Sequence, residues 1–173
     1  TSVDELNLAK QQTFERLINE ELADDQCGGF LVWGDPALYD STIRILQAIL
    51  ASGTCTFEFE VIPGITSVQA LAAQHKVPLN QIGRSVEITT GRRLAAGQVS
   101  DADSLVVMLD AQDAYQHVAD QQTQIYWGAY LGTPDEILTS GKLGEVAQQI
   151  ERVRKAARQA NGWIMDTYLL RKP

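Results

Sequence analysis

Two short loops rich in glycine and proline are the parts of this sequence best suited to holding a small ligand. The first loop is Gly34-Asp35-Pro36-Ala37-Leu38-Tyr39, and the second is Val61-Ile62-Pro63-Gly64-Ile65-Thr66-Ser67. Glycine lets a ligand approach the backbone, and proline fixes the turn. Hydroxyl groups and unpaired amides at a helix start favour polar ligands. Either loop alone could be an ordinary strand-to-helix turn, but two side by side favour a binding site.

The segments around the loops predict how they are positioned. A short continuous apolar run at 30–33 predicts a buried strand before the first loop, and a second strand is predicted at 57–62, leading into the second loop. Helices are expected over 3–22, between Ser41 and Gly53, and after Thr66. The repeated order of strand, turn and helix predicts a parallel sheet covered by helices, whose loops gather at the carboxyl ends of the strands. We therefore expect the two loops to converge.

The second half of the sequence has a different pattern. Alternating or apolar runs predict strands at 85–90, 105–109, 124–130 and 163–170. A long amphipathic helix is predicted at 143–157, and Thr133-Pro134-Asp135-Glu136 has the composition of a helix start. We place a domain boundary near Gly83, which gives domains of residues 1–82 and 83–173.

Charge and composition restrict the partners. The 173 residues include 14 Lys and Arg against 22 Asp and Glu, a formal charge of −8, so nucleic acid and anionic membranes are not expected partners. No apolar run approaches the roughly 20 residues that cross a bilayer, and no signal peptide is visible. Cys27 and Cys55 fit neither a disulfide framework nor a metal spacing. We expect reduced thiols in a cytoplasmic protein.

The two loops, with Trp33 before the first and Glu60 before the second, resemble those of the tetrapyrrole methylase family. Members of this family use S-adenosylmethionine to methylate corrin and porphyrin precursors. Three later segments extend the resemblance in order over nearly the whole chain: 89–94, 126–134 and 162–168. The resemblance implies a two-domain α/β fold, that of class III S-adenosylmethionine-dependent methyltransferases. The first domain would be incomplete, because the family's glycine-rich opening loop has no counterpart here.

The resemblance also implies which residues hold the methyl donor. S-adenosylmethionine would contact Trp33, Gly34, Asp35, Leu38, Thr66, Ser67, Leu109 and Gly132. Leu109 takes the place of a methionine in relatives and keeps its volume and apolar character. Plain core packing is an equally good interpretation of Leu109.

Arg92 and Arg93 are candidates for binding the methyl acceptor. They follow Gly91, and Arg84 lies before the same predicted strand. Arginine can bind a carboxylate through two parallel hydrogen bonds, and precorrins, the carboxylated tetrapyrroles of the corrin pathway, carry several carboxylates. The alternative is a solvated pair with no partner.

Other polar and aromatic residues leave alternatives open. The aromatic side chains of Tyr126, Trp127 and Tyr130 could stack on a macrocycle or form cross-strand core pairs, and Asp110 and Asp166 could face a cleft or cap strand ends. His75 and His117 have no partner at metal spacing, so we expect packing or surface roles and no metal site. No residue is predicted as the catalytic base.

The hypothesis for function is a C-methyltransferase acting on a precorrin, with a homodimer typical of the family. Two alternatives to this hypothesis are another methyl acceptor and a role without catalysis. The same fold could methylate ribosomal RNA, which the charge disfavours, or a protein histidine. The chain could also be a non-catalytic module that binds small molecules.

Overall fold

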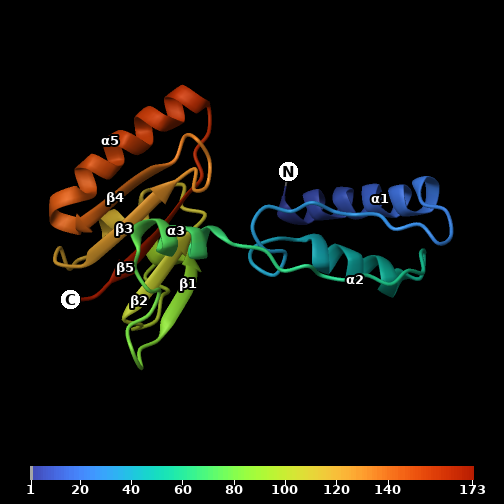
Figure 1. Ribbon diagram of the computed structural model, residues 1–173, viewed down its shortest axis with the longest axis horizontal. Coiled ribbons are helices and arrows are strands. Elements are labelled where there is room, and N and C mark those ends of the chain that lie inside the picture. The colour runs from blue at the N-terminus through green and yellow to red at the C-terminus, as the bar shows by residue number, and fades with distance from the viewer. Residues whose placement is uncertain (1) are drawn as a thin grey trace. The chain divides into compact units, whose positions relative to one another are not determined.

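The computed structural model describes residues 2–173, which form two compact units joined between Thr66 and Ser67 (Figure 1). This division comes earlier in the chain than the predicted boundary near Gly83. The reason is that helix α3 (Ser67–His75) packs against the sheet of the second unit and belongs to its core. Each unit is described by itself below.

The first unit contains two helices, α1 (Val3–Glu21) and α2 (Thr42–Ser52). Ser2 and Glu5 form a capping box at the start of α1. Gly53 ends α2 with a φ of 71°, a left-handed conformation that favours glycine. Both predicted helices are confirmed.

The small core of the first unit lies between these helices. Phe14 and Ile18 of α1 pack against Ile45, Ile49 and Cys55. No side chain of α1 is buried, however, so this core is shallow.

The strands predicted at 30–33 and 57–62 are wrong for the described structure. No ladder of backbone hydrogen bonds joins either segment to another part of residues 2–173. A strand needs such a partner to satisfy its N–H and C=O groups. Leu31 is fully exposed and Ile62 is 79% exposed. Because no neighbouring strand pairs with them, neither segment forms a strand.

The second unit is built on a five-stranded mixed sheet of order β1-β2-β5-β3-β4. The strands are β1 (Val86–Thr90), β2 (Ser104–Met108), β3 (Gln124–Ala129), β4 (Ile137–Lys142) and β5 (Asp166–Arg171). β1 is parallel to β2, and β5 is antiparallel to both β2 and β3. The carboxyl ends of β1, β2 and β3 therefore lie at one edge, where β5 begins.

The predicted strands of this unit are confirmed with small shifts, and one local prediction is wrong. The last strand begins at Asp166, three residues later than expected. Thr133–Glu136 is a turn and not a helix start, because Glu136 N donates to the Thr133 carbonyl and the chain then enters β4. Pairing of β4 with β3 outweighs the local helix preference.

Helices cover both faces of the sheet. The long helix α5 (Leu143–Asn161) packs on β3 and β4, and its Ile150 belongs to the main core with Trp127 and Tyr168. α3 packs on the opposite face (Figure 1), where Gly128 leaves room for Leu71. A short helix α4 (Gly91–Ala95) and a 3-10 turn η1 (Ala114–His117) follow β1 and β2 at the edge described above. None of the helices described has the length and apolar character needed to span a membrane.

Candidate functional site

The two loops predicted to converge do meet in the first unit. Asp35 Oδ2 accepts a hydrogen bond from Gly64 N at 2.8 Å, and Asp35 Oδ1 accepts one from Ala37 N at 2.7 Å. These backbone bonds, the one from Gly64 first, lower the pKa of Asp35. The carboxylate is therefore ionised and joins the loops. The predicted convergence is confirmed, although the strands expected to produce it do not form.

Close backbone contact explains the glycines in these loops. A Cβ on Gly64 would lie 2.1 Å from the carbonyl oxygen of Gly34. Gly34 has a φ of 71°, and a Cβ there would lie 3.4 Å from Thr66 Cα. The Leu38 amide closes the first turn on the Asp35 carbonyl at 3.2 Å. Only glycine at position 64 permits this approach.

The surface around the joined loops is amphipathic. Trp33 and Ile65 are about three-quarters exposed, at 76% and 77%, whereas Thr66 is buried. Apolar side chains thus accompany one ionised carboxylate. This combination suits a ligand that carries both apolar groups and positive charge.

The predicted residues of the second unit gather at the edge where β1, β2 and β3 end. Leu109 follows β2, Gly132 follows β3, and Arg92 and Arg93 follow β1. Ser67 lies at the same edge, because its hydroxyl is 3.0 Å from that of Thr167 in β5. Leu109 is 59% exposed and has a φ of 53°, so it is not a core residue. Its contact with a ligand stays a prediction.

The two arginines after β1 differ in their surroundings. Arg93 Nη2 donates to the Gln98 carbonyl at 2.9 Å and fixes the following turn. Arg92 is exposed, and its guanidinium forms no ion pair within residues 2–173. Arg84 lies before β1 and is 3.9 Å from Asp103. The length of β1, roughly 17 Å for five residues, separates Arg84 from Arg92, so the three do not form one basic cluster.

A buried polar cluster lies beneath the same edge and includes a residue that the sequence analysis missed. Arg154 of α5 is 7% exposed, and its Nε lies 2.9 Å from Asp166 Oδ2 and 3.3 Å from Asp113 Oδ1. Its Nη2 donates to the Asp110 carbonyl. One buried guanidinium therefore joins the end of β2, the start of η1 and the start of β5 to α5.

Asp110 and Asp166 are part of this cluster, and both also line the cavity described below. Trp127 Nε1 donates to Asp166 Oδ2 at 2.9 Å. Tyr168 donates its hydroxyl to Asp110 Oδ2 at 2.7 Å, and Ala114 N donates to the same oxygen. Asp110 acts as a cap at the strand end, and its side chain also explains Gly91, where a Cβ would lie 2.5 Å from the carboxyl group.

The cluster contains more carboxyl groups than cations. Burial raises the pKa of Asp166 and of Asp113, although Arg154 acts in the opposite direction on both. Burial also works against the charge of Arg154, but Asp166 and Asp113 outweigh it and raise the pKa of Arg154. The arginine stays charged, and the carboxyl groups beside it bind protons more readily than a solvated aspartate.

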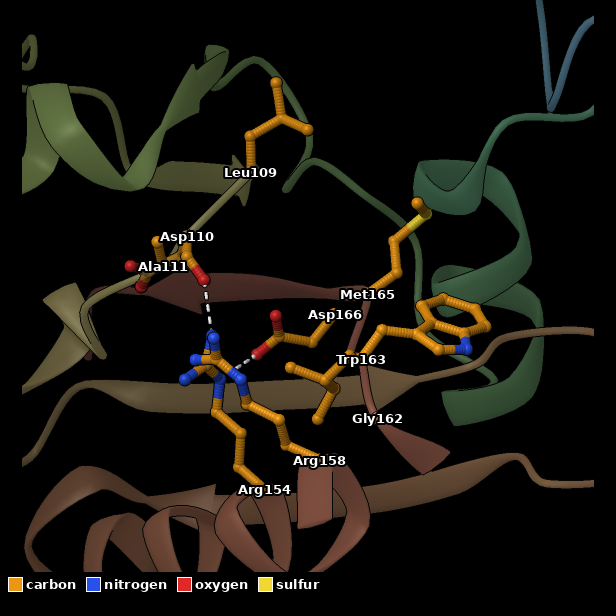
Figure 2. A pocket seen from close by; sticks show the side chains of 10 residues that line it. Leu109, Asp110, Ala111, Arg154, Arg158, Gly162, Trp163, Met165 and Asp166 are labelled. Atoms are coloured by element: carbon orange, nitrogen blue, oxygen red, sulfur yellow. Dashed lines mark hydrogen bonds and ion pairs between the residues drawn. The ribbon is translucent and has the colours of Figure 1, made fainter. Parts of the chain in front are cut away.

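A cavity of about 430 Å³ opens above this cluster (Figure 2). Its apolar wall includes Leu109, Trp163 and Met165, and its polar wall includes Arg158 and Asp166. Figure 2 shows Arg154 and Arg158 reaching up from the same helix, and Asp166 between Arg154 and the space below Leu109.

The aromatic and histidine side chains have structural contacts. Trp127 is fully buried, and the hydroxyl of the buried Tyr130 donates to the Trp163 carbonyl at 2.5 Å. Tyr126 contacts His75, whose Nε2 lies 3.0 Å from the Trp127 carbonyl. Cross-strand and core packing is therefore the correct interpretation for Trp127 and Tyr130, and His75 is a packing residue as predicted.

Comparison with known proteins identifies the family. The family model described as Tetrapyrrole (Corrin/Porphyrin) Methylases matches residues 1–147. The chain belongs to the tetrapyrrole methylase family. This tetrapyrrole methylase chain is 53% identical over 171 residues to a protein of Sinorhizobium sp named precorrin-6A synthase (deacetylating). The match covers 99% of this chain and 66% of that protein. The chain therefore spans just under two thirds of the length of that relative.

Solved structures agree with the family. A protein of Corynebacterium diphtheriae described as related to cobalamin synthesis (CobF) superposes on this tetrapyrrole methylase chain with a TM-score of 0.88. It is 42% identical, and the match covers 95% of this chain and 69% of that one. A uroporphyrin-III-C-methyltransferase of Thermus thermophilus, 23% identical with a TM-score of 0.68, shares the fold; the match covers 95% of this chain and 68% of that one. The α/β fold expected from the sequence is confirmed.

Proposed function

We propose that the protein containing this chain is an S-adenosylmethionine-dependent C-methyltransferase of corrin-ring biosynthesis. It would methylate precorrin-5 at C1 and release acetate, which gives precorrin-6A. The observation that carries this proposal is the 53% identity over 99% of the chain to a protein named precorrin-6A synthase (deacetylating). The joined loops of the first unit support it, because they provide a surface suited to a cationic, amphipathic donor.

The loop residues fit S-adenosylmethionine in charge and space. We infer that it is held by the residues that the family resemblance implies: Trp33, Gly34, Asp35, Leu38, Thr66, Ser67, Leu109 and Gly132. The ionised Asp35 is complementary to a sulfonium, and Gly34 and Gly64 keep side chains out of the loop backbone. When bound, this donor supplies an already activated methyl group. For the methyl transfer, the protein residues need only hold the reacting carbon in line with the methyl group and exclude water.

A single-turnover experiment tests the proposed function. The full-length protein is mixed with precorrin-5 and S-adenosylmethionine labelled in its methyl group. We expect label in precorrin-6A and one equivalent of acetate for each methyl group transferred. Label found only in RNA or protein, or none transferred, would refute the proposal.

The joined loops give a prediction for donor affinity. The double substitution Asp35→Ala with Thr66→Val should weaken binding of S-adenosylhomocysteine by about tenfold or more, since it removes the carboxylate that holds Gly64. Isothermal calorimetry on the full-length protein measures this. The control Asp24→Ala removes an exposed carboxylate of the same unit and should leave affinity unchanged. Equal affinity in the double variant would exclude these loops from the donor site.

The arginines give a prediction for the acceptor. We infer that Arg92 binds a precorrin carboxylate, with Arg93 placing the turn beside it. The double substitution Arg92→Ala with Arg93→Ala should weaken precorrin-5 binding by about tenfold and leave S-adenosylhomocysteine affinity nearly intact. Arg84→Ala, at the other end of β1, is the matched control. Loss of both affinities together would mean that the pair supports the fold instead.

A further inference from the structure

The cavity above the buried cluster places a carboxyl group and a free cation on the same wall. Asp166 Oδ2 accepts hydrogen bonds from Arg154 Nε and from Trp127 Nε1. Figure 2 shows the other oxygen directed away from Arg154, toward the space below Leu109. One oxygen is thus held in place, and the second faces the cavity that Asp166 lines.

Arg158 lies one helical turn after Arg154 and lines the same cavity. Its side chain forms no ion pair within the described residues, in contrast to Arg154. The remaining lining is mostly apolar: Leu109, Trp163, Ile164 and Met165. An apolar cavity of about 430 Å³ with a few converging polar groups has the size and character of a ligand site.

The surroundings of Asp166 affect how readily its carboxyl group takes up a proton. Arg154 is the buried cation beside it, whereas Asp110 and Asp113 add negative charge from the loop after β2. Burial raises the pKa of Asp166 despite Arg154. A carboxyl with a raised pKa is better matched to proton transfer near neutral pH than a solvated aspartate.

Release of an acetyl group needs these two functions. We propose that Asp166 is the general base, and Arg158 the oxyanion-stabilising cation, for the acetate-releasing step of the reaction proposed above. This inference rests on that proposed function and assigns residues to its hydrolytic half.

The step balances as follows. Asp166 takes a proton from water, and the hydroxide forms a bond to the acetyl carbonyl carbon, whose oxygen becomes an oxyanion beside Arg158. The bond between the acetyl carbon and the ring carbon then breaks, and acetic acid leaves. The electron pair stays on the ring carbon, which receives the methyl group. Acetic acid and Asp166 each release one proton to solvent.

The test uses the full-length protein with precorrin-5, and measures precorrin-6A and acetate. Asp166→Asn keeps the shape of the side chain and an acceptor for Trp127, and should lower kcat by about a hundredfold or more. Asp166→Glu, which keeps the carboxyl group, should retain part of the rate that Asp166→Asn loses. S-adenosylhomocysteine affinity should stay unchanged.

Arg158 and pH give independent measurements. Arg158→Ala should lower kcat by about a hundredfold, with partial recovery in Arg158→Lys, whereas the exposed control Arg152→Ala should not. Wild-type kcat should fall as the pH drops through the raised pKa of Asp166, and this acid limb should be absent from the residual activity of Asp166→Asn.

The outcomes separate the two proposals. A wild-type protein that makes no precorrin-6A refutes the proposed function itself. An active wild type with an undiminished rate in Asp166→Asn overturns the assignment of the base. So does an Asp166→Asn variant that has lost rate but keeps the acid limb of the pH profile while its donor affinity is intact. If Asp166→Asn does not fold, Arg158→Ala decides, and an undiminished rate there overturns the inference.

Discussion

Replacing Arg154 by alanine should lower the free energy of unfolding by about 3–5 kcal/mol, because it leaves buried carboxyl groups without their cation. Arg154 is 7% exposed and bonds Asp166, Asp113 and the Asp110 carbonyl. No other described cation has an ion pair with these carboxyl groups. The measurement is urea denaturation of the full-length protein, followed by far-ultraviolet circular dichroism.

The matched control for this prediction is Arg152→Ala on the same helix. Arg152 is exposed and has no ion pair within residues 2–173, so its loss should change stability by less than about 0.5 kcal/mol. Arg154→Lys keeps the charge but not the fork of donors, and should fall between the two. A loss in Arg154→Ala no greater than that of the control would show that the cluster does not stabilise the second unit.

Replacing Gly64 by alanine should separate the two loops of the first unit. Its Cβ would lie 2.1 Å from the Gly34 carbonyl oxygen and 3.1 Å from the Gly34 carbonyl carbon, and both are backbone atoms. The loops must move apart, which should break the bond from Gly64 N to Asp35. We expect a loss of about 1–3 kcal/mol in stability and at least about tenfold in S-adenosylhomocysteine affinity.

Gly29→Ala is the control for this substitution. A Cβ at Gly29 meets nothing within 4 Å, so stability and affinity should stay close to wild type. Calorimetry and denaturation measure both effects. Unchanged affinity in Gly64→Ala would mean that the donor does not depend on the contact between the loops.

Local signals in the sequence were sufficient for most helices. Gly53 predicted the end of α2 because a left-handed C-cap depends only on the residues beside it. The apolar spacing of 143–157 predicted α5 for the same reason. Such features need no information about distant partners.

Pairing between distant segments limited the rest. The segments 30–33 and 57–62 are rich in aromatic and β-branched residues that are common in strands, but a strand forms only where a second strand supplies its hydrogen bonds. The turn at Thr133 shows the opposite case, since pairing of β4 with β3 overrode a helix-like sequence. Composition alone does not report such pairs.

The site was predicted in part for a similar reason. The loop glycines and Asp35 signalled a close turn, and the structure brings them together. Arg154 was not predicted, because charged residues of an amphipathic helix normally lie on its exposed face. A signal existed, since Arg154 lies four residues after Ile150 and three before Ala157, on the buried side of α5. The sequence does not predict the left-handed backbone of Leu109, because a positive φ is uncommon for leucine.

A crystal structure of the full-length protein with S-adenosylhomocysteine tests the central claim most directly, namely that the two joined loops hold the methyl donor. The account predicts ligand density in contact with Gly34, Asp35 and Thr66. Ligand density elsewhere, with no contact to either of the two loops, would contradict it.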